Sequence, residues 1–176
     1  FIDGALFSGA ETHANFTLCD RLLEDGIIPI FLVKNSDSQS LCKAIQDING
    51  FNNDMHWAYS ILKQFERTRI FSYVSDDNQQ VGFRRKKYVS FYKMFEKRSP
   101  VRIEFTEKVY TFIKANINMY FDIIGYLYLL HGKLDNPQIR PIIIAENYAR
   151  ELLKSTNLYK ELANMNMTGT MNEVRF

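Results

Sequence analysis

Apolar and polar positions divide the first third of the chain into strands and a helix. Ile27 to Val33 is a continuous apolar run, typical of a strand that is covered on both faces. Before it, from Thr12 to Leu23, apolar residues recur at helical spacing, and Gly26 can end that helix. Phe1 and Ile2 precede a glycine-bearing loop and predict the end of an earlier strand. A strand, a helix and a strand in this order predict a right-handed parallel crossover.

A second unit of the same kind follows. After Asn35, a polar loop leads into a helix that ends at Asn49 and Gly50, and a further helix can begin at Asn53. The strand-like run from Arg69 to Val74 comes next. Repeated helix and strand patterns predict an α/β fold, and we expect a three-layer parallel sheet over residues 1–82.

The pattern changes after Gly82. A basic and aromatic stretch leads to Pro100, and a long helix can then begin at Thr106. Pro141 can open a last helix. We therefore expect residues 83–176 to form a basic-aromatic and mainly helical extension of the α/β domain.

Composition and charge restrict the function only weakly. The chain has 176 residues and a formal net charge of +2, which is too small to indicate nucleic acid by itself. Its two cysteines show no metal-binding spacing and suit a reducing compartment, so we expect an intracellular protein, cytoplasmic or nuclear. The apolar run from Ile117 to Leu130 contains Asp122 and is shorter than a bilayer span, so we expect no membrane span. The first residue is Phe1, inside a predicted strand, and we expect further residues upstream.

Polar residues follow the predicted strands at their carboxyl ends. Asp3 follows the first strand, Asn35 the second, and Asp76 and Asp77 the third. In open α/β sheets, ligands bind beyond these strand ends, so the side chains are expected to gather at one rim. Asp3, Asp76 and Asp77 are then candidate metal ligands. Turns are also rich in Asp, Asn and Gly, and a turn without a site is the alternative at each position.

The opening segment resembles the start of a haloacid dehalogenase (HAD)-type phosphatase. GALFSG follows Asp3, and GIIPIFLVKN is similar to the second strand of that family. The resemblance covers roughly the first 80 residues. It implies a HAD- or Rossmann-like sheet and places Asp3 at the general acid/base, with Phe1 at the position of the nucleophile. It further implies phosphate binding by Lys34 or Asn35, a phosphate-neutralising Lys63, and Mg²⁺ held by Asp76 and Asp77.

One catalytic carboxylate of that pattern is missing. Phenylalanine cannot attack phosphorus, and if Asp3 is the nucleophile then Ala5 occupies the acid/base position. This favours a catalytically degenerate relative without a cofactor. An active Mg²⁺-dependent phosphohydrolase using Asp3 and Lys63 is the alternative. A nuclease of the PIN or NYN type is a further one, because FIDG also resembles the first strand of those enzymes.

Six residues of the basic-aromatic stretch are candidate contacts to nucleic acid. Basic side chains can neutralise phosphates while aromatic rings stack on bases or on a protein surface. The candidates are Arg84, Arg85, Lys86, Lys87, Tyr88 and Tyr92. The alternative is an amphipathic helix with an aromatic core face and a charged solvent face.

Taken together, the sequence favours a structural or assembly protein over an enzyme. Its partners would be other protein subunits or further copies of itself, and nucleic acid through the basic stretch. Asn, Lys, Ile, Phe and Tyr are abundant, which suits an AT-rich genome and is compatible with a viral structural, nucleocapsid-associated protein located in the virion.

Overall fold

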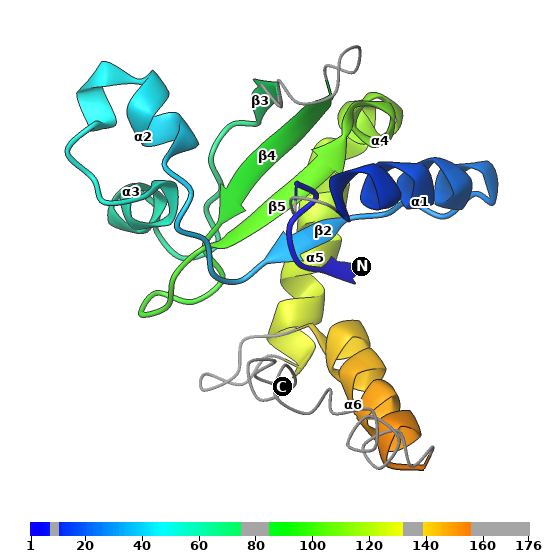
Figure 1. Cartoon of the computed structure of the whole chain (residues 1–176). Coiled ribbons are helices and arrows are strands. Elements are labelled where there is room, and N and C mark those ends of the chain that lie inside the picture. Colours follow the sequence, from blue (N-terminus) through cyan, green and yellow to red (C-terminus); the bar gives the residue numbers. More distant parts are fainter. Residues whose placement is uncertain (8–10, 75–84, 132–138, 156–176) are drawn as a thin grey trace, which may run out of the picture.

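A five-stranded mixed sheet organises the protein (Figure 1). The computed structural model describes residues 1–7, 11–74, 85–131 and 139–155. The strands in these ranges are β1 (Ile2–Asp3), β2 (Phe31–Val33), β3 (Phe71–Val74), β4 (Lys86–Tyr92) and β5 (Val101–Thr106). The α-helices are α1 (Thr12–Glu24), α2 (Ser40–Ala44), α3 (Asp54–Ile61), α4 (Glu107–Ile113), α5 (Ile117–His131) and α6 (Arg140–Ser155), and short 3₁₀ turns η2 (Gln46–Ile48) and η3 (Lys114–Asn116) follow α2 and α4.

The strands lie in the order β1-β2-β5-β4-β3, and only β1 and β2 pair in parallel. The pairings of β2 with β5, β5 with β4 and β4 with β3 are antiparallel. The crossover predicted from β1 through α1 to β2 is thus present, and the α/β class is confirmed. The fully parallel sheet is wrong. The opening strand is a two-residue edge strand.

The basic-aromatic stretch and the segment after Pro100 form strands β4 and β5. The expectation that residues beyond 82 are helical is therefore wrong for this part. β5 lies between β2 and β4, so strands from both sides of residue 82 share one sheet. The physical reason is visible in β5: Val101, Ile103 and Phe105 enter one core, while Arg102 and Glu104 alternate with them on the other face.

Three of the predicted capping residues, Gly26, Asn53 and Thr106, lie at helix ends, whereas the helix predicted to end at Asn49 and Gly50 ends at Ala44, and the long helix predicted from Thr106 is divided into α4 and α5. Gly26 takes φ +75° after α1, where Ile27 N donates to the carbonyl of Leu22 at 2.8 Å. Asn53 Oδ1 accepts from His56 N at the start of α3 (2.7 Å). Thr106 Oγ1 accepts from Val109 N at the start of α4 (3.3 Å). These local hydrogen bonds fix where each helix leaves the sheet.

Helices lie over both faces of the sheet. On one face α4, α5 and the first turn of α6 enclose the main core, in which Phe105, Ile124 and Tyr128 are fully buried. On the opposite face α2 and α3 cover β3 and β4, while α1 covers β2. Figure 1 shows α1 and the α2–α3 pair over opposite ends of the same face of the sheet, with α5 behind the sheet. The strip of sheet between α1 and α3 carries the polar residues of β5.

Within the described residues, none of the helices combines the length and the apolarity needed to cross a bilayer.

Candidate functional site

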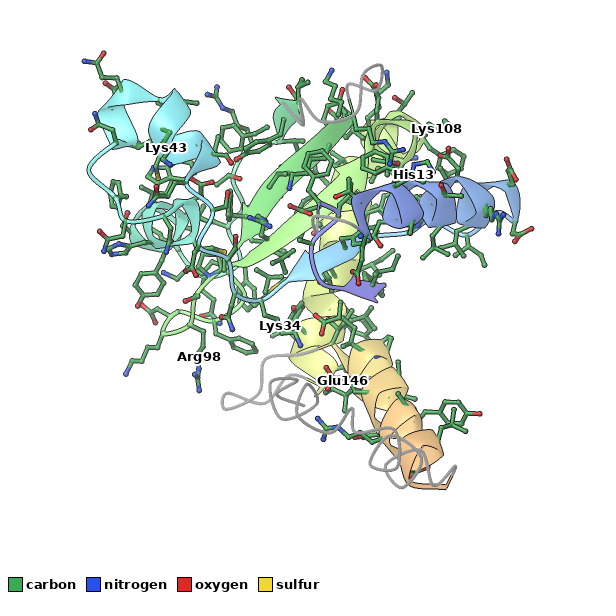
Figure 2. The ribbon with its side chains drawn as sticks, viewed as in Figure 1. His13, Lys34, Lys43, Arg98, Lys108 and Glu146 are labelled. Carbon is green, nitrogen blue, oxygen red and sulfur yellow. The ribbon has the colours of Figure 1, made fainter. Side chains whose placement is uncertain are left out.

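Asp3 forms an ion pair at the edge of the sheet. Its Oδ2 lies 3.0 Å from Lys34 Nζ, and the same ammonium lies 3.6 Å from Glu146 Oε1 on α6. Figure 2 shows Lys34 pointing toward Glu146, below the carboxyl end of β2. Lys34, expected to bind phosphate, is thus engaged by two carboxylates. A lysine between two acids joins the first two strands to the last helix.

The structure does not bring the carboxyl ends of β1 and β3 to one rim of the sheet. β3 runs antiparallel to β4, and the chain of pairings makes it antiparallel to β2 and β1 as well. The carboxyl end of β3 at Val74 therefore lies at the opposite end of the sheet from Asp3. Asp76 and Asp77 themselves lie outside the described residues. Where the chain is described, no three His, Cys, Asp or Glu side chains form a group able to hold a metal ion.

Lys63 and Asp3 lie beside different strands. Lys63 is exposed after α3, and its backbone N donates to Glu66 Oε2 (2.8 Å). Two residues further along, Phe65 N donates to the carbonyl of Lys93, which directly follows β4. Because β2 and β5 separate β1 from β4, the structure does not bring the two candidate catalytic residues together.

Asn35 lines a hollow at the carboxyl end of β2. The hollow has a volume of about 470 Å³ and is bounded by the start of α3 and the loop before β5. Its walls are mostly polar: Asn35, Ser36, Asp37, Asn53, Met55, His56, Tyr59, Lys97 and Ser99. Such a hollow at a strand end could admit a small polar ligand.

Three of the residues predicted to contact nucleic acid are engaged in contacts within the protein. Arg85 Nη1 donates to the carbonyl of Thr12 (3.2 Å), and its guanidinium lies over the ring of Phe16. Lys86 Nζ lies 3.4 Å from Glu107 Oε1. Tyr88 stacks on Tyr110 with 4.1 Å between the ring centroids. Arg84 lies outside the described residues.

Lys87 and Tyr92 are buried, so neither presents its side chain to a ligand in solution. Tyr92 packs edge-on against Phe121 in the main core, and burial raises its pKa. The alternation of β4 explains this placement, since Lys87 faces the α1–α3 side of the sheet while Tyr92 faces α5. An aromatic core face was expected, but on a helix rather than on a strand.

A buried carboxylate, Glu104, connects two buried cations. Its Oε1 lies 2.7 Å from Lys87 Nζ and 3.0 Å from Arg102 Nε, and its Oε2 accepts from Leu6 N at 2.6 Å. The Arg102 N–H does not point along a hydrogen bond, so that contact is ionic. Arg102 Nη1 donates to Ser36 Oγ, a wall residue of the hollow. We call Glu104, Lys87 and Arg102 the ion cluster.

The ion cluster holds two positive side chains for one carboxylate. Burial lowers the pKa of Lys87, and Glu104 opposes that shift. Phe7 covers the ammonium, with 4.5 Å from Nζ to the ring centroid. The cluster thereby fixes the loop after β1 to the centre of the sheet.

Asp54 is a second buried carboxylate, at the start of α3. Its Oδ1 accepts from Leu41 N (3.0 Å) and Cys42 N (2.9 Å), and its Oδ2 accepts from Ser38 Oγ (3.1 Å). It therefore holds the first turn of α2 against α3. These three side-chain hydrogen bonds serve to hold the fold together.

The outer side of α5 is apolar and exposed. Tyr128, Ile124 and Phe121 point into the core, yet the opposite side carries Met119, Ile123, Tyr126 and Leu130, each between 44% and 60% exposed. We call these last four residues the α5 stripe. Their spacing of four, three and four residues puts them in one line along the helix. A helix that is apolar all round is typical of one that is buried on every side.

α6 also exposes apolar side chains. Ile139, just before α6, and Ile142 in its first turn pack into the main core, and α6 contacts α5. The following turns expose Ile144, Tyr148 and Leu152 at four-residue spacing. Nine of the sixteen large hydrophobic side chains exposed in the described part of the chain lie on α4, α5 and α6: Phe112, Met119, Ile123, Tyr126, Leu129, Leu130, Ile144, Tyr148 and Leu152.

The residues predicted from the sequence do not include Glu104 and Arg102 of the ion cluster, Asp54 or the α5 stripe. The alternation in VRIEFT could have shown β5 and its inward-facing Arg102 and Glu104. The α5 stripe could have been found from apolar residues on opposite sides of one helix.

No protein-family model matches the sequence, and neither the curated proteins nor the solved structures contain a significant match.

Proposed function

We propose that this protein has a structural or assembly role and binds other protein subunits through the exposed apolar surface of α5 and α6. The observation that carries the proposal is the α5 stripe, which lies directly opposite the core-facing side of the same helix. Contiguous exposed apolar surface on a protein marks an interaction site.

The aromatic and large aliphatic side chains of this surface would supply most of its binding energy. Tyr126 and Tyr148 are the kind of residue that dominates the energy of protein interfaces. Asp122 is the only Asp, Glu, Lys or Arg residue within α5. Depletion of charge and enrichment in aromatic residues are typical of the centre of an interface rather than of its rim.

Photo-crosslinking tests the proposal. A benzophenone amino acid replaces Tyr126 in one variant and Tyr59 in a matched control, because Tyr59 is also exposed but lies on α3 at the opposite face of the sheet. After irradiation in cells that make the protein, position 126 should give a discrete protein adduct that position 59 does not. Adding Ile123→Glu to the first variant should abolish the adduct. Equal adducts at both positions, or none at 126, would contradict the proposal.

A Mg²⁺-dependent phosphohydrolase is the second candidate, favoured by the hollow at the carboxyl end of β2 with Asn35 in its wall. The crossover from β1 to β2 is the part of the fold that supports descent from a HAD-type domain. Asp3 faces Lys34 and α6 instead of this hollow's wall residues, which makes it a poor general acid for a ligand there. Mg²⁺-dependent hydrolysis of p-nitrophenyl phosphate that is lost in Asp3→Asn would support the hydrolase and count against the assembly role.

A further inference from the structure

The partner that fits the α5 stripe best is a second copy of this chain. We propose that two copies pair through α5 in antiparallel orientation, with a twofold axis between Ile124 and Gly125, and this inference rests on the assembly role proposed above.

The charge pattern suits self-pairing. In a twofold interface the same patch of each subunit faces its copy, so a charged patch repels itself unless its signs alternate. The α5 stripe contains no charged residue, and Asp122 stands beside it as the only Asp, Glu, Lys or Arg of α5. In antiparallel orientation each Asp122 faces the region of Leu127 of the other copy. In parallel orientation the two Asp122 carboxylates would lie side by side, which is unfavourable.

The register is self-complementary. Antiparallel pairing about the point between Ile124 and Gly125 places Ile123 of one copy against Tyr126 of the other, and Met119 against Leu130. Each contact then joins one larger and one smaller or more flexible side chain, which lets the two rows interdigitate. The four, three, four spacing of the α5 stripe is the spacing with which paired helices meet.

The exposed area is close to what a stable dimer needs. Large apolar side chains present roughly 150–200 Å² each when fully exposed, so the four residues of the α5 stripe and the three exposed residues of α6 offer roughly 500–700 Å² when about half exposed. A standard interface takes about 800 Å² from each partner. The α5 stripe supplies the centre of such an interface, and Ile144, Tyr148 and Leu152 on the neighbouring α6 extend it.

Cysteine crosslinking tests the orientation. Met119 and Leu130 are eleven positions apart, or about 16 Å along the helix. The full chain is made as Met119→Cys and as Leu130→Cys, and the two are oxidised singly and as a mixture. Antiparallel pairing predicts a disulfide-linked dimer from the mixture and little from either variant alone. Wild-type protein is the background control, because its Cys19 and Cys42 are buried.

The reverse result, with each variant crosslinking to itself and the mixture giving no additional species, would overturn the antiparallel pairing. Sedimentation equilibrium supplies a second measurement. The wild type should be dimeric at tens of micromolar, and Ile123→Glu should weaken the dimer at least 100-fold while Lys108→Glu, on the exposed side of α4, leaves it unchanged within threefold. A monomeric wild type at 200 µM would defeat this inference. The assembly role would survive that result if the Tyr126 adduct described above contains a different polypeptide, and would fail with it if there is no adduct.

Discussion

Glu104 Oε1 lies 2.7 Å from Lys87 Nζ, and the two residues belong to adjacent antiparallel strands that bury both side chains. Glu104 pairs in register with Val89, so Lys87 is its diagonal neighbour on the same face of the sheet. Arg102 shares the carboxylate from the other side. Removing Glu104 and removing Lys87 should therefore change the free energy of unfolding by different amounts.

Glu104→Gln should strongly destabilise the protein. The change leaves Lys87 and Arg102 buried without a counter-charge, which costs about 3–5 kcal/mol in comparable buried pairs. The free energy of unfolding from urea titration measures the loss. Lys108→Gln is the control, because its ion pair with Asp20 is exposed and should be worth less than about 1 kcal/mol. A loss below 1 kcal/mol for Glu104→Gln would contradict the assignment.

Lys87→Met should cost less than Glu104→Gln, by about 2 kcal/mol or more. Glu104 keeps Arg102 and Leu6 N as partners, and the variant no longer buries an ammonium whose pKa is lowered by desolvation. Urea unfolding of the two variants under the same conditions gives the comparison. Equal losses of stability in the two variants would mean that Lys87, and not Arg102, is the cation that neutralises Glu104.

Asp54→Ala should destabilise the α2–α3 region by about 2–4 kcal/mol. It leaves two backbone N–H groups at the start of α2 without their acceptor. Hydrogen exchange should show faster exchange at Leu41 and Cys42 of α2 before the strands of the sheet respond. Asn53→Ala is the matched control, with a loss nearer 1 kcal/mol, because it removes a single exposed cap. Unchanged exchange at Leu41 would contradict this role.

Gly125→Ala should destabilise the protein although alanine favours helices. A methyl group at position 125 would lie 2.7 Å from Tyr92 Oη, inside the main core. The clash is expected to outweigh the gain in helix propensity of about 1 kcal/mol and to leave a net loss of roughly 1–2 kcal/mol. Tyr92→Phe removes that oxygen, so the double variant should recover most of the loss. The two changes form a double-mutant cycle, measured by thermal or urea unfolding. A coupling energy of zero would show that the two residues are not in contact.

Stability should fall as pH rises from about 9 to 11, in part because of Cys19. Burial raises the pKa of its thiol to about 11, from an ordinary value near 9, with a smaller contribution from Asp20. In that window the unfolded chain releases a proton that the folded protein keeps, so ionisation favours unfolding by at most roughly 2–3 kcal/mol. Cys19→Ala should therefore lose less stability than the wild type between pH 9 and pH 10.5. Both proteins keep Lys87, whose lowered pKa acts in the opposite direction, so its effect cancels in the comparison. Parallel stability curves would contradict the assignment to Cys19.

Local pattern was enough to place several helix ends and the first crossover. Gly26, Asn53 and Thr106 end or start helices through contacts within a few residues, which is why their positions could be predicted from neighbours in the sequence. The run from Phe31 to Val33 is buried on both faces, as its continuous apolar character indicates.

Strand direction and pairing were decided only by the tertiary structure. A strand's residues do not record which neighbour it pairs with, and β5 enters the sheet between β2 and β4 from more than sixty residues further along the chain than β2. That insertion reverses β3 relative to β1, separates Val74 from Asp3, and brings Glu104 to Leu6 across 98 positions. The sequence alone determined the α/β class, three of the helix ends and the chemistry of each residue. Which acids and cations meet, and which side of α5 stays exposed, depends on long-range packing that no local pattern encodes.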